Sequence, residues 1–262
     1  MNSVNEFNVG SLNILTGFTI KIIAVLAMII DHTGAVFDLH SGYRVVGRLA
    51  FPLFAFLIAE GYKHTTNIRK YLLRLGLFAF ISEIPYDLAF NQVQGYPMTV
   101  DFLNGTNIFY TLFLGLLCAF LLDRAREKIL GTAGELELRT GDRIVRPTNL
   151  VMINLVILLA LVIISVAGMS AADWIGSDYG GLGVLFIFLM AAFNQSKTLN
   201  LCIVAFFMFW LYFPQFDMLT GAFLALPIMA FASGEQGKPV KWIFYFVYPG
   251  HLLLLYFFAL ML

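Results

Sequence analysis

A few ionisable residues lie inside long apolar stretches of this sequence, and they are the residues that could do chemistry. The first stretch carries Lys21, Asp31 and His32. A neutral imidazole can accept a proton from an attacking amine or hydroxyl near physiological pH. A neighbouring carboxylate can orient the ring, and a lysine can hold an anionic donor or stabilise a developing oxyanion. This combination of residues suits acyl transfer from a thioester to an amine or hydroxyl.

The spacing of these residues indicates how a helix would present them. Lys21 and His32 are eleven residues apart, which returns to within about 20° of the same helical face and advances about 16 Å along the axis. We therefore predict that both line one cavity, with Lys21 nearer the cytoplasm. Asp31 is adjacent to His32 and cannot share its face, so we expect it to meet a neighbouring helix.

The second and third apolar stretches carry further charges. Arg48 lies in the second stretch, and the third has Arg74 near its start and then Glu83 and Asp87, which share one helical face because they are four residues apart. Each ionisable group at bilayer depth costs about 2.5–3.5 kcal/mol, so it usually has a partner and a function. Alternatively, Arg48 forms a structural ion pair with Glu83 or Asp87.

Three more residues allow two interpretations each. Glu60 and His64, also four residues apart, either face the cavity or lie at the cytoplasmic interface. His251, in the run YPGHLLLL, either faces the cavity or is a core histidine with its hydrogen bonds satisfied. Since the fourth to ninth stretches hold almost no other ionisable group, we expect the first three helices to build most of the polar site and the later helices mainly to enclose it.

The composition indicates the environment of these elements. Of the 262 residues, 60% are hydrophobic and 12% charged, with a mean hydropathy of +0.84. A soluble domain carries about 25% charged residues. The chain is therefore expected to be a polytopic membrane protein in contact with membrane lipids. Its net charge of zero gives no indication of a nucleic-acid partner.

The apolar stretches predict the architecture, because a bilayer core needs roughly 20 apolar helical residues. We predict an all-α transmembrane helix bundle of about nine helices, with a range of eight to ten because the sixth to eighth stretches are short. We expect the first stretch to be too long and too polar inside for a cleavable signal peptide. The predicted spans are 13–37, 45–62, 71–90, 107–123, 149–168, 181–193, 198–213, 218–232 and 242–262.

Loop charges predict the orientation. Lysine and arginine concentrate in the connections after the second, fourth, sixth and eighth spans, whereas the opposite connections are acidic and have Arg44 as their only basic residue. Because basic loops stay in the cytoplasm, we predict a cytoplasmic N-terminus and an external C-terminus. Within a single domain over residues 1–262, the charged segment 124–148 is predicted to be a solvated cytoplasmic loop.

Six stretches carry a resemblance to a known family. They read KIIAVLAMIIDHTG, GRLAFPLFAFLIAEGYKHT, KYLLRLGLFAFISEIPYDLAF, NIFYTLFLG, SDYGGLGVL and KWIFYFVYPGHLLLL, between residues 21 and 255. With them the chain resembles the TraX family, named for an inner-membrane protein of conjugation systems that N-acetylates pilin. The fourth stretch departs from the family pattern only in having Tyr110 in place of Phe. The Lys21–x10–His32 spacing is also similar to the Arg/Lys–x10–His signature of the wider membrane acyltransferases.

The resemblance implies an acetyltransferase in the cytoplasmic (inner) membrane, with acetyl-CoA as co-substrate and no metal. His32, beside Asp31, would be the catalytic base or a transient acyl acceptor, and Lys21, Arg48 and Arg74 would contact the donor or stabilise the oxyanion. The acceptor would be a peptide, saccharide or lipid, with the N-terminal amine of a pilin-like peptide as the family precedent. The further cavity residues would be Glu60, His64, Glu83, Asp87, Asp178, Tyr179 and His251.

Two other functions remain open at this point. The same acidic and histidine residues could relay protons in a small proton-coupled transporter. Against this, the charges lie in one third of the chain instead of in the paired halves common in transporters. The chain could also be a non-catalytic assembly component of a conjugation or secretion apparatus.

Overall fold

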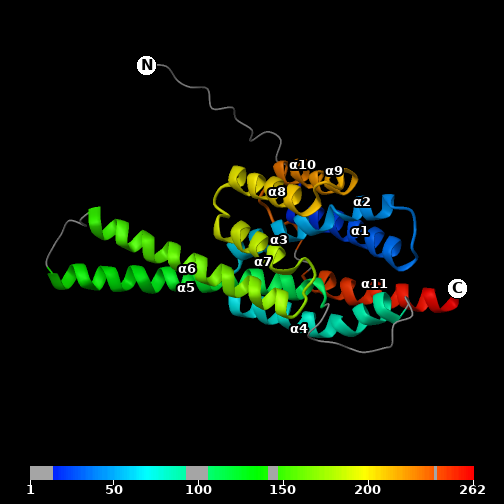
Figure 1. The fold of residues 1–262 in the computed structure, drawn as a ribbon, viewed down its shortest axis with the longest axis horizontal. Helices are drawn as coiled ribbons and strands as arrows, with labels where there is room; N and C mark the ends of the chain where they lie inside the picture. Colours follow the sequence, from blue (N-terminus) through cyan, green and yellow to red (C-terminus); the bar gives the residue numbers. More distant parts are fainter. Residues whose placement is uncertain (1–13, 93–105, 141–146, 239–240) are drawn as a thin grey trace, which may run out of the picture. The chain divides into compact units, whose positions relative to one another are not determined.

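The regular secondary structure of the described residues is helical, which confirms the predicted all-α fold (Figure 1). The computed structural model describes residues 14–92, 106–140, 147–238 and 241–262. The helices are α1 (Gly17–Val36), α2 (Gly42–Gly47), α3 (Ala50–His64), α4 (Ile68–Asp87), the π-helical turn η2 (Leu88–Gln92), α5 (Ile108–Thr140), α6 (Pro147–Trp174), α7 (Gly180–Ala192), α8 (Lys197–Tyr212), α9 (Phe216–Phe223), α10 (Ala225–Ala230) and α11 (Lys241–Met261).

Each of the nine predicted spans coincides with a helical segment of the described chain, where α2 with α3 and α9 with α10 each make up one segment. Five helical stretches are long and apolar enough to cross a bilayer, and three shorter apolar helices accompany them. The chain is therefore a multi-pass membrane protein. The five long stretches are Gly17–Val36, Gly42–His64, Ile108–Thr132, Leu150–Trp174 and Trp242–Met261.

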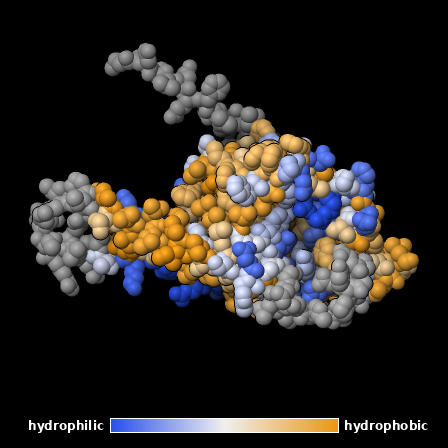
Figure 2. Space-filling model, viewed as in Figure 1, coloured by the Kyte–Doolittle hydropathy of each residue, from blue (hydrophilic) through white to orange (hydrophobic). Residues whose placement is uncertain are grey.

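Helix α6 presents the most continuous apolar surface. Its side chains at Val151, Leu155, Leu159, Ile163 and Val166 are each more than half exposed. Figure 2 shows hydrophobic residues gathered along this helix. A helix that is apolar on all sides and exposed suits contact with lipid acyl chains instead of water.

The segment 124–148, predicted to be a solvated loop, is largely helical. Helix α5 continues without a break to Thr140, and α6 begins at Pro147. The charge and the glycines of this segment suggested a linker, but most of its residues are strong helix formers. Its first turns also carry ion pairs three residues apart, Arg124 with Glu127 at 2.8 Å and Arg126 with Asp123 at 3.5 Å. Residues 141–146 lie outside the described residues.

The chain divides into two compact units. The first consists of residues 1–60, 84–99 and 194–262, and the second of 61–83 and 100–193. In the first unit, α1 packs on α2, α11 and η2, and α9 covers α2. In the second unit, α5, α6 and α7 pack against one another.

Helices α1 and α11 of the first unit run in the same direction (Figure 1). Near their starts, the Lys21 ammonium lies 5.7 Å from the centroid of the Phe244 ring. Further along both helices, His32 contacts His251. The start of α1 is also tied to the segment before α11, since the Gly17 amide donates to the Glu235 carbonyl at 2.7 Å. Because the two helices run parallel, both Lys21 and His32 of α1 contact residues of α11.

Small residues allow close packing between the helices of the second unit. A Cβ atom added at Gly115 of α5 would lie 2.6 Å from Cβ of Ile187 on α7. A Cβ added at Gly168 of α6 would lie 2.4 Å from the Cys118 sulfur of α5. Small residues at such positions are how helices in membranes approach each other closely.

This packing predicts opposite effects of two alanine substitutions in α5. Gly115→Ala should destabilise the protein by about 1–3 kcal/mol, because the added methyl group overlaps the Ile187 side chain. Gly131→Ala, in the same helix but with open space around it, should be neutral or stabilising because alanine favours helix. Thermal melting of both variants in detergent checks the prediction, and equal melting temperatures would contradict it.

Candidate functional site

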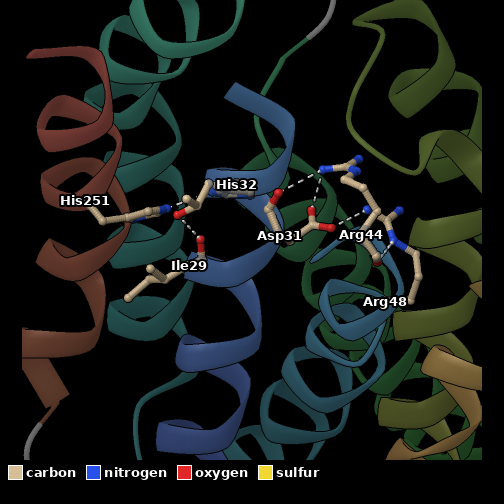
Figure 3. Close-up of polar contacts among 7 residues, drawn as sticks. Ile29, Asp31, His32, Arg44, Arg48 and His251 are labelled. Atoms are coloured by element: carbon tan, nitrogen blue, oxygen red, sulfur yellow. Dashed lines mark hydrogen bonds and ion pairs between the residues drawn. The ribbon is translucent and has the colours of Figure 1, made fainter. Parts of the chain in front are cut away.

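His32 forms a hydrogen-bonded pair with a histidine from the last helix. Its Nδ1 atom lies 2.7 Å from Nε2 of His251 (Figure 3). Nδ1 of His251 lies 2.8 Å from the Val247 carbonyl oxygen. His251 is buried and His32 is partly buried. Helix α11 thus contributes His251 to the polar site, in addition to the residues of the first three predicted helices.

Aromatic rings hold the His32 imidazole in place. The ring lies nearly parallel to that of His251, with the planes inclined by 16° and the centroids 4.9 Å apart. The rings of Phe90 from η2 and Tyr248 from α11 meet it edge-on, at 5.2 and 5.8 Å. The His32 ring is therefore fixed by contacts from two elements besides its own helix.

Asp31 points to the other side of α1, where it binds two arginines (Figure 3). Arg44 Nη1 donates to its Oδ2 atom at 2.8 Å, and Arg48 Nη2 donates to Oδ1 at 2.7 Å. This confirms that Asp31 meets a neighbouring helix. It also means that the group hydrogen-bonded to the His32 ring is His251 and not the adjacent carboxylate.

The short helix α2 is built to bring both arginines to one carboxylate. Arg44 and Arg48 are four residues apart and so lie on one face, and Arg48 Nε also donates to the Arg44 carbonyl at 3.2 Å. Gly47 lies against Asp31, where an added Cβ would come within 2.0 Å of Oδ1. The two guanidinium groups and one carboxylate carry a net charge of +1.

Lys21 lies at the other end of the same face of α1. Its ammonium group contacts the Phe244 ring, and Phe18 lies edge-on to that ring with the centroids 6.0 Å apart. Lys238 lies over the Phe18 ring at 6.0 Å. Lys21 and His32 therefore both face α11, which agrees with the shared face predicted from their spacing.

Three other candidate residues lie at the ends of α3 and α4. Glu60 is half-buried near the end of α3, where it interacts electrostatically with Lys197 of α8. His64 is the last residue of α3 and is exposed, which fits the interfacial interpretation. Asp87 is buried at the end of α4.

In the second unit, Glu83 has an amide partner that the sequence did not indicate. The fully buried Glu83 accepts from Asn107 Nδ2 at 2.5 Å and from the Asn107 backbone amide at 3.3 Å. Asn107 also donates to the Ala79 carbonyl at 2.8 Å. Asn107 precedes α5 directly, so this contact ties the start of α5 to α4.

Asp178 and Tyr179 form part of the turn that leads into α7. The Asp178 backbone amide donates to the Thr106 carbonyl at 3.0 Å, and the Thr111 hydroxyl donates to the Asp178 carbonyl. Tyr179 precedes α7 with a left-handed backbone (φ 64°). Both residues thus have a backbone role in this turn, and a role of their side chains in a cavity stays a prediction.

Arg74 also belongs to the second unit, where its guanidinium group lies 5.6 Å from the centroid of the Tyr71 ring. The predicted site residues are therefore divided between the units. Lys21, Asp31, His32, Arg48 and His251 all belong to the first unit, where His32 contacts His251 and Asp31 contacts Arg48. A joint action of Arg74 with Lys21 and Arg48 stays a prediction.

Several apolar helices around a hydrogen-bonded histidine pair and an ion-paired carboxylate define a multi-pass membrane protein with a polar site among its helices. Within this class the chain belongs to the TraX protein family, whose model matches residues 16–259. Membership agrees with the resemblance inferred from the six sequence stretches. The matched range includes all the candidate site residues.

The chain is also similar to a protein described as "Probable fimbrial assembly protein FimC, serogroup H1" from Dichelobacter nodosus. The two are 35% identical over 113 residues, which is 40% of this chain and 46% of the relative. The similarity thus spans less than half the length of that relative. No solved structure matches the chain.

The Asp31 cluster generates a prediction about stability. Asp31→Asn keeps the size of the side chain but leaves two guanidinium groups, both only partly exposed, without their shared counter-charge. Removing one partner of such a buried pair costs about 3–5 kcal/mol, so the melting temperature in detergent should fall clearly.

A matched control is Asp38→Asn, which changes an exposed carboxylate just after α1 and should leave the melting temperature unchanged. Replacing Arg44 by Met in the Asp31→Asn background should recover part of the loss by removing one of the two positive charges. An Asp31→Asn protein that melts like the unmodified chain would contradict the structural role of this cluster.

Proposed function

We propose that this protein is a membrane-embedded acetyltransferase that moves an acetyl group from cytoplasmic acetyl-CoA to an amine or hydroxyl acceptor. The observation that carries the proposal is the His32 imidazole, held at Nδ1 by His251 among membrane-spanning helices. Membership of the TraX family supports it. An ionisable residue within apolar helices is costly to retain, which favours a functional role over packing alone.

The chemistry would be general-base catalysis by His32. The acceptor amine attacks the thioester carbonyl carbon, the new C–N bond forms, and the amine proton passes to the His32 ring. The C–S bond then breaks, and the CoA thiolate leaves and takes the proton back from His32. The products are the acetylated acceptor and CoA, and the imidazole returns to its neutral form.

Lys21 is the best-placed cation for the donor. It lies on the same side of α1 as His32, about 16 Å nearer the start of the helix. An ammonium group there would attract the negatively charged end of acetyl-CoA while the thioester reaches the histidine. Arg48, which donates to Asp31, is better suited to holding α2 in place than to binding the donor.

The parallel arrangement of α1 and α11 supports the proposed orientation. If both cross the bilayer, an odd number of crossings separates the start of α1 from the end of α11, as in a nine-helix protein. With the basic connections in the cytoplasm, the N-terminus is cytoplasmic, the C-terminus is external, and the membrane is the cytoplasmic (inner) one. The donor then enters from the Lys21 end and the acceptor from the His32 end.

The acceptor that the comparisons favour is a pilus subunit. The relative named as a probable fimbrial assembly protein and the TraX family both connect the chain to pilus assembly or conjugation. We therefore propose the N-terminal amine of a pilin-like peptide as the first acceptor to test, with a saccharide or lipid amine or hydroxyl as the alternatives.

Acetyl transfer by the purified protein tests the proposal. With radiolabelled acetyl-CoA and a pilin-like peptide, the unmodified chain should acetylate the peptide or slowly hydrolyse the thioester. His32→Ala should lower this rate by roughly 10²-fold or more, the usual contribution of a general base. His40→Ala is the matched control, since His40 is exposed after α1, and its rate should not change.

Two outcomes would contradict the proposal. One is full activity in His32→Ala, which would exclude the histidine mechanism. The other is proton flux in proteoliposomes without acetyl-CoA, lost in His32→Ala and accompanied by no acetyl transfer. That result would favour the proton-coupled transporter, because a hydrogen-bonded histidine pair can also relay protons.

A further inference from the structure

The hydrogen bonds of His251 determine where its proton lies. Its Nδ1 atom is 2.8 Å from the Val247 carbonyl oxygen. A carbonyl oxygen can only accept a hydrogen bond, so Nδ1 of His251 must carry the hydrogen. In the neutral imidazole, the other ring nitrogen, Nε2, then has a lone pair and can only accept.

The position of the proton on His251 in turn determines the position of the proton on His32. Its Nδ1 atom lies 2.7 Å from Nε2 of His251, a distance that requires one hydrogen between the two nitrogens. Since Nε2 of His251 is the acceptor, Nδ1 of His32 is the donor and carries the hydrogen. The lone pair of neutral His32 is therefore on Nε2, which accepts no hydrogen bond from the residues that the structure describes.

We infer that His251 is a positioning residue that fixes the tautomer of His32, so that Nε2 of His32 is the nitrogen that reacts. The inference rests on the proposed acetyltransferase function and names the atom at which it operates. Either chemical role of His32, base or acyl acceptor, needs the lone pair that this arrangement keeps on Nε2.

The identity of the orienting group has a chemical consequence. In many enzymes a carboxylate holds the catalytic histidine and stabilises the imidazolium ion. Here Asp31 is occupied by Arg44 and Arg48, and a neutral imidazole takes that place. When Nε2 of His32 accepts a proton, the bond from Nδ1 to the neutral His251 ring becomes charge-assisted and strengthens, which stabilises the imidazolium ion.

Two substitutions of His251 separate this role from simple packing. His251→Phe fills the space but offers no acceptor to Nδ1 of His32. His251→Gln offers an amide oxygen that can accept from Nδ1 but cannot titrate. We expect His251→Phe to lower kcat by roughly 10²-fold or more, as the loss of a tautomer-fixing partner does, with KM for acetyl-CoA unchanged. His251→Gln should recover a large part of that loss.

The tautomer itself can be measured without substrate. The chain has four histidines, so ¹⁵N-histidine labelling gives few ring signals, and a His32→Gln variant identifies those of His32. The unmodified protein should show the proton of neutral His32 on Nδ1, and His251→Phe should lose this preference. Melting temperatures close to that of the unmodified protein establish that the variants are folded.

The outcomes distinguish the inference from the function on which it rests. A proton on Nε2 of His32 in the unmodified protein would overturn the inference whatever the activity. Equal loss of kcat in His251→Phe and His251→Gln would also overturn it, since His251 would then matter only for packing. The expected tautomer in a protein that transfers no acetyl group would support the tautomer assignment and refute the proposed function.

Discussion

The site depends on the ion pairs of Asp31 with Arg44 in α2 and with Arg48 directly after it. A carboxylate and two guanidinium groups among apolar helices are stable only together, because each alone would be a poorly solvated charge. Their contact fixes α2 against one side of α1, and Gly47 provides the close approach that it needs. The next residue, His32, then points to the opposite side of the helix, toward α11. Two adjacent residues thus connect α1 to two different parts of the first unit.

The fold could be predicted from the sequence because hydrophobic length is a strong signal in a membrane protein. All nine helical segments of the described chain lie where apolar stretches indicated them. The segment from Arg124 to Thr140 was predicted to be a loop but is helical. Its charges and glycines are typical of a linker, whereas its other residues favour helix. Charge content reports exposure to water, and it does not by itself distinguish an exposed helix from a loop.

The site was only partly predictable. Helical spacing correctly predicted that Lys21 and His32 lie on one side of α1 and that Asp31 points elsewhere. This could be predicted because the direction of a side chain around a helix depends only on its position along that helix. The partners are non-local: His251 lies 219 residues from His32, and no periodicity connects them. Arg44 could have been predicted as a second partner of Asp31, because it lies four residues before Arg48. Its position in a predicted connection between two spans suggested instead that it was a loop residue. Asn107 carries no charge, so nothing in the sequence marked it as the partner of Glu83.

The most direct test of the proposed role of His32 is a structure of the protein bound to a non-reactive acetyl-CoA analogue. We expect the carbonyl of the analogue beside Nε2 of His32, with room for an acceptor nitrogen within hydrogen-bond reach of that atom, about 3 Å. The phosphate groups of the analogue should lie toward the Lys21 end of α1. An analogue bound with its carbonyl far from His32, or with Nε2 of His32 turned away from it, would rule out this role of His32.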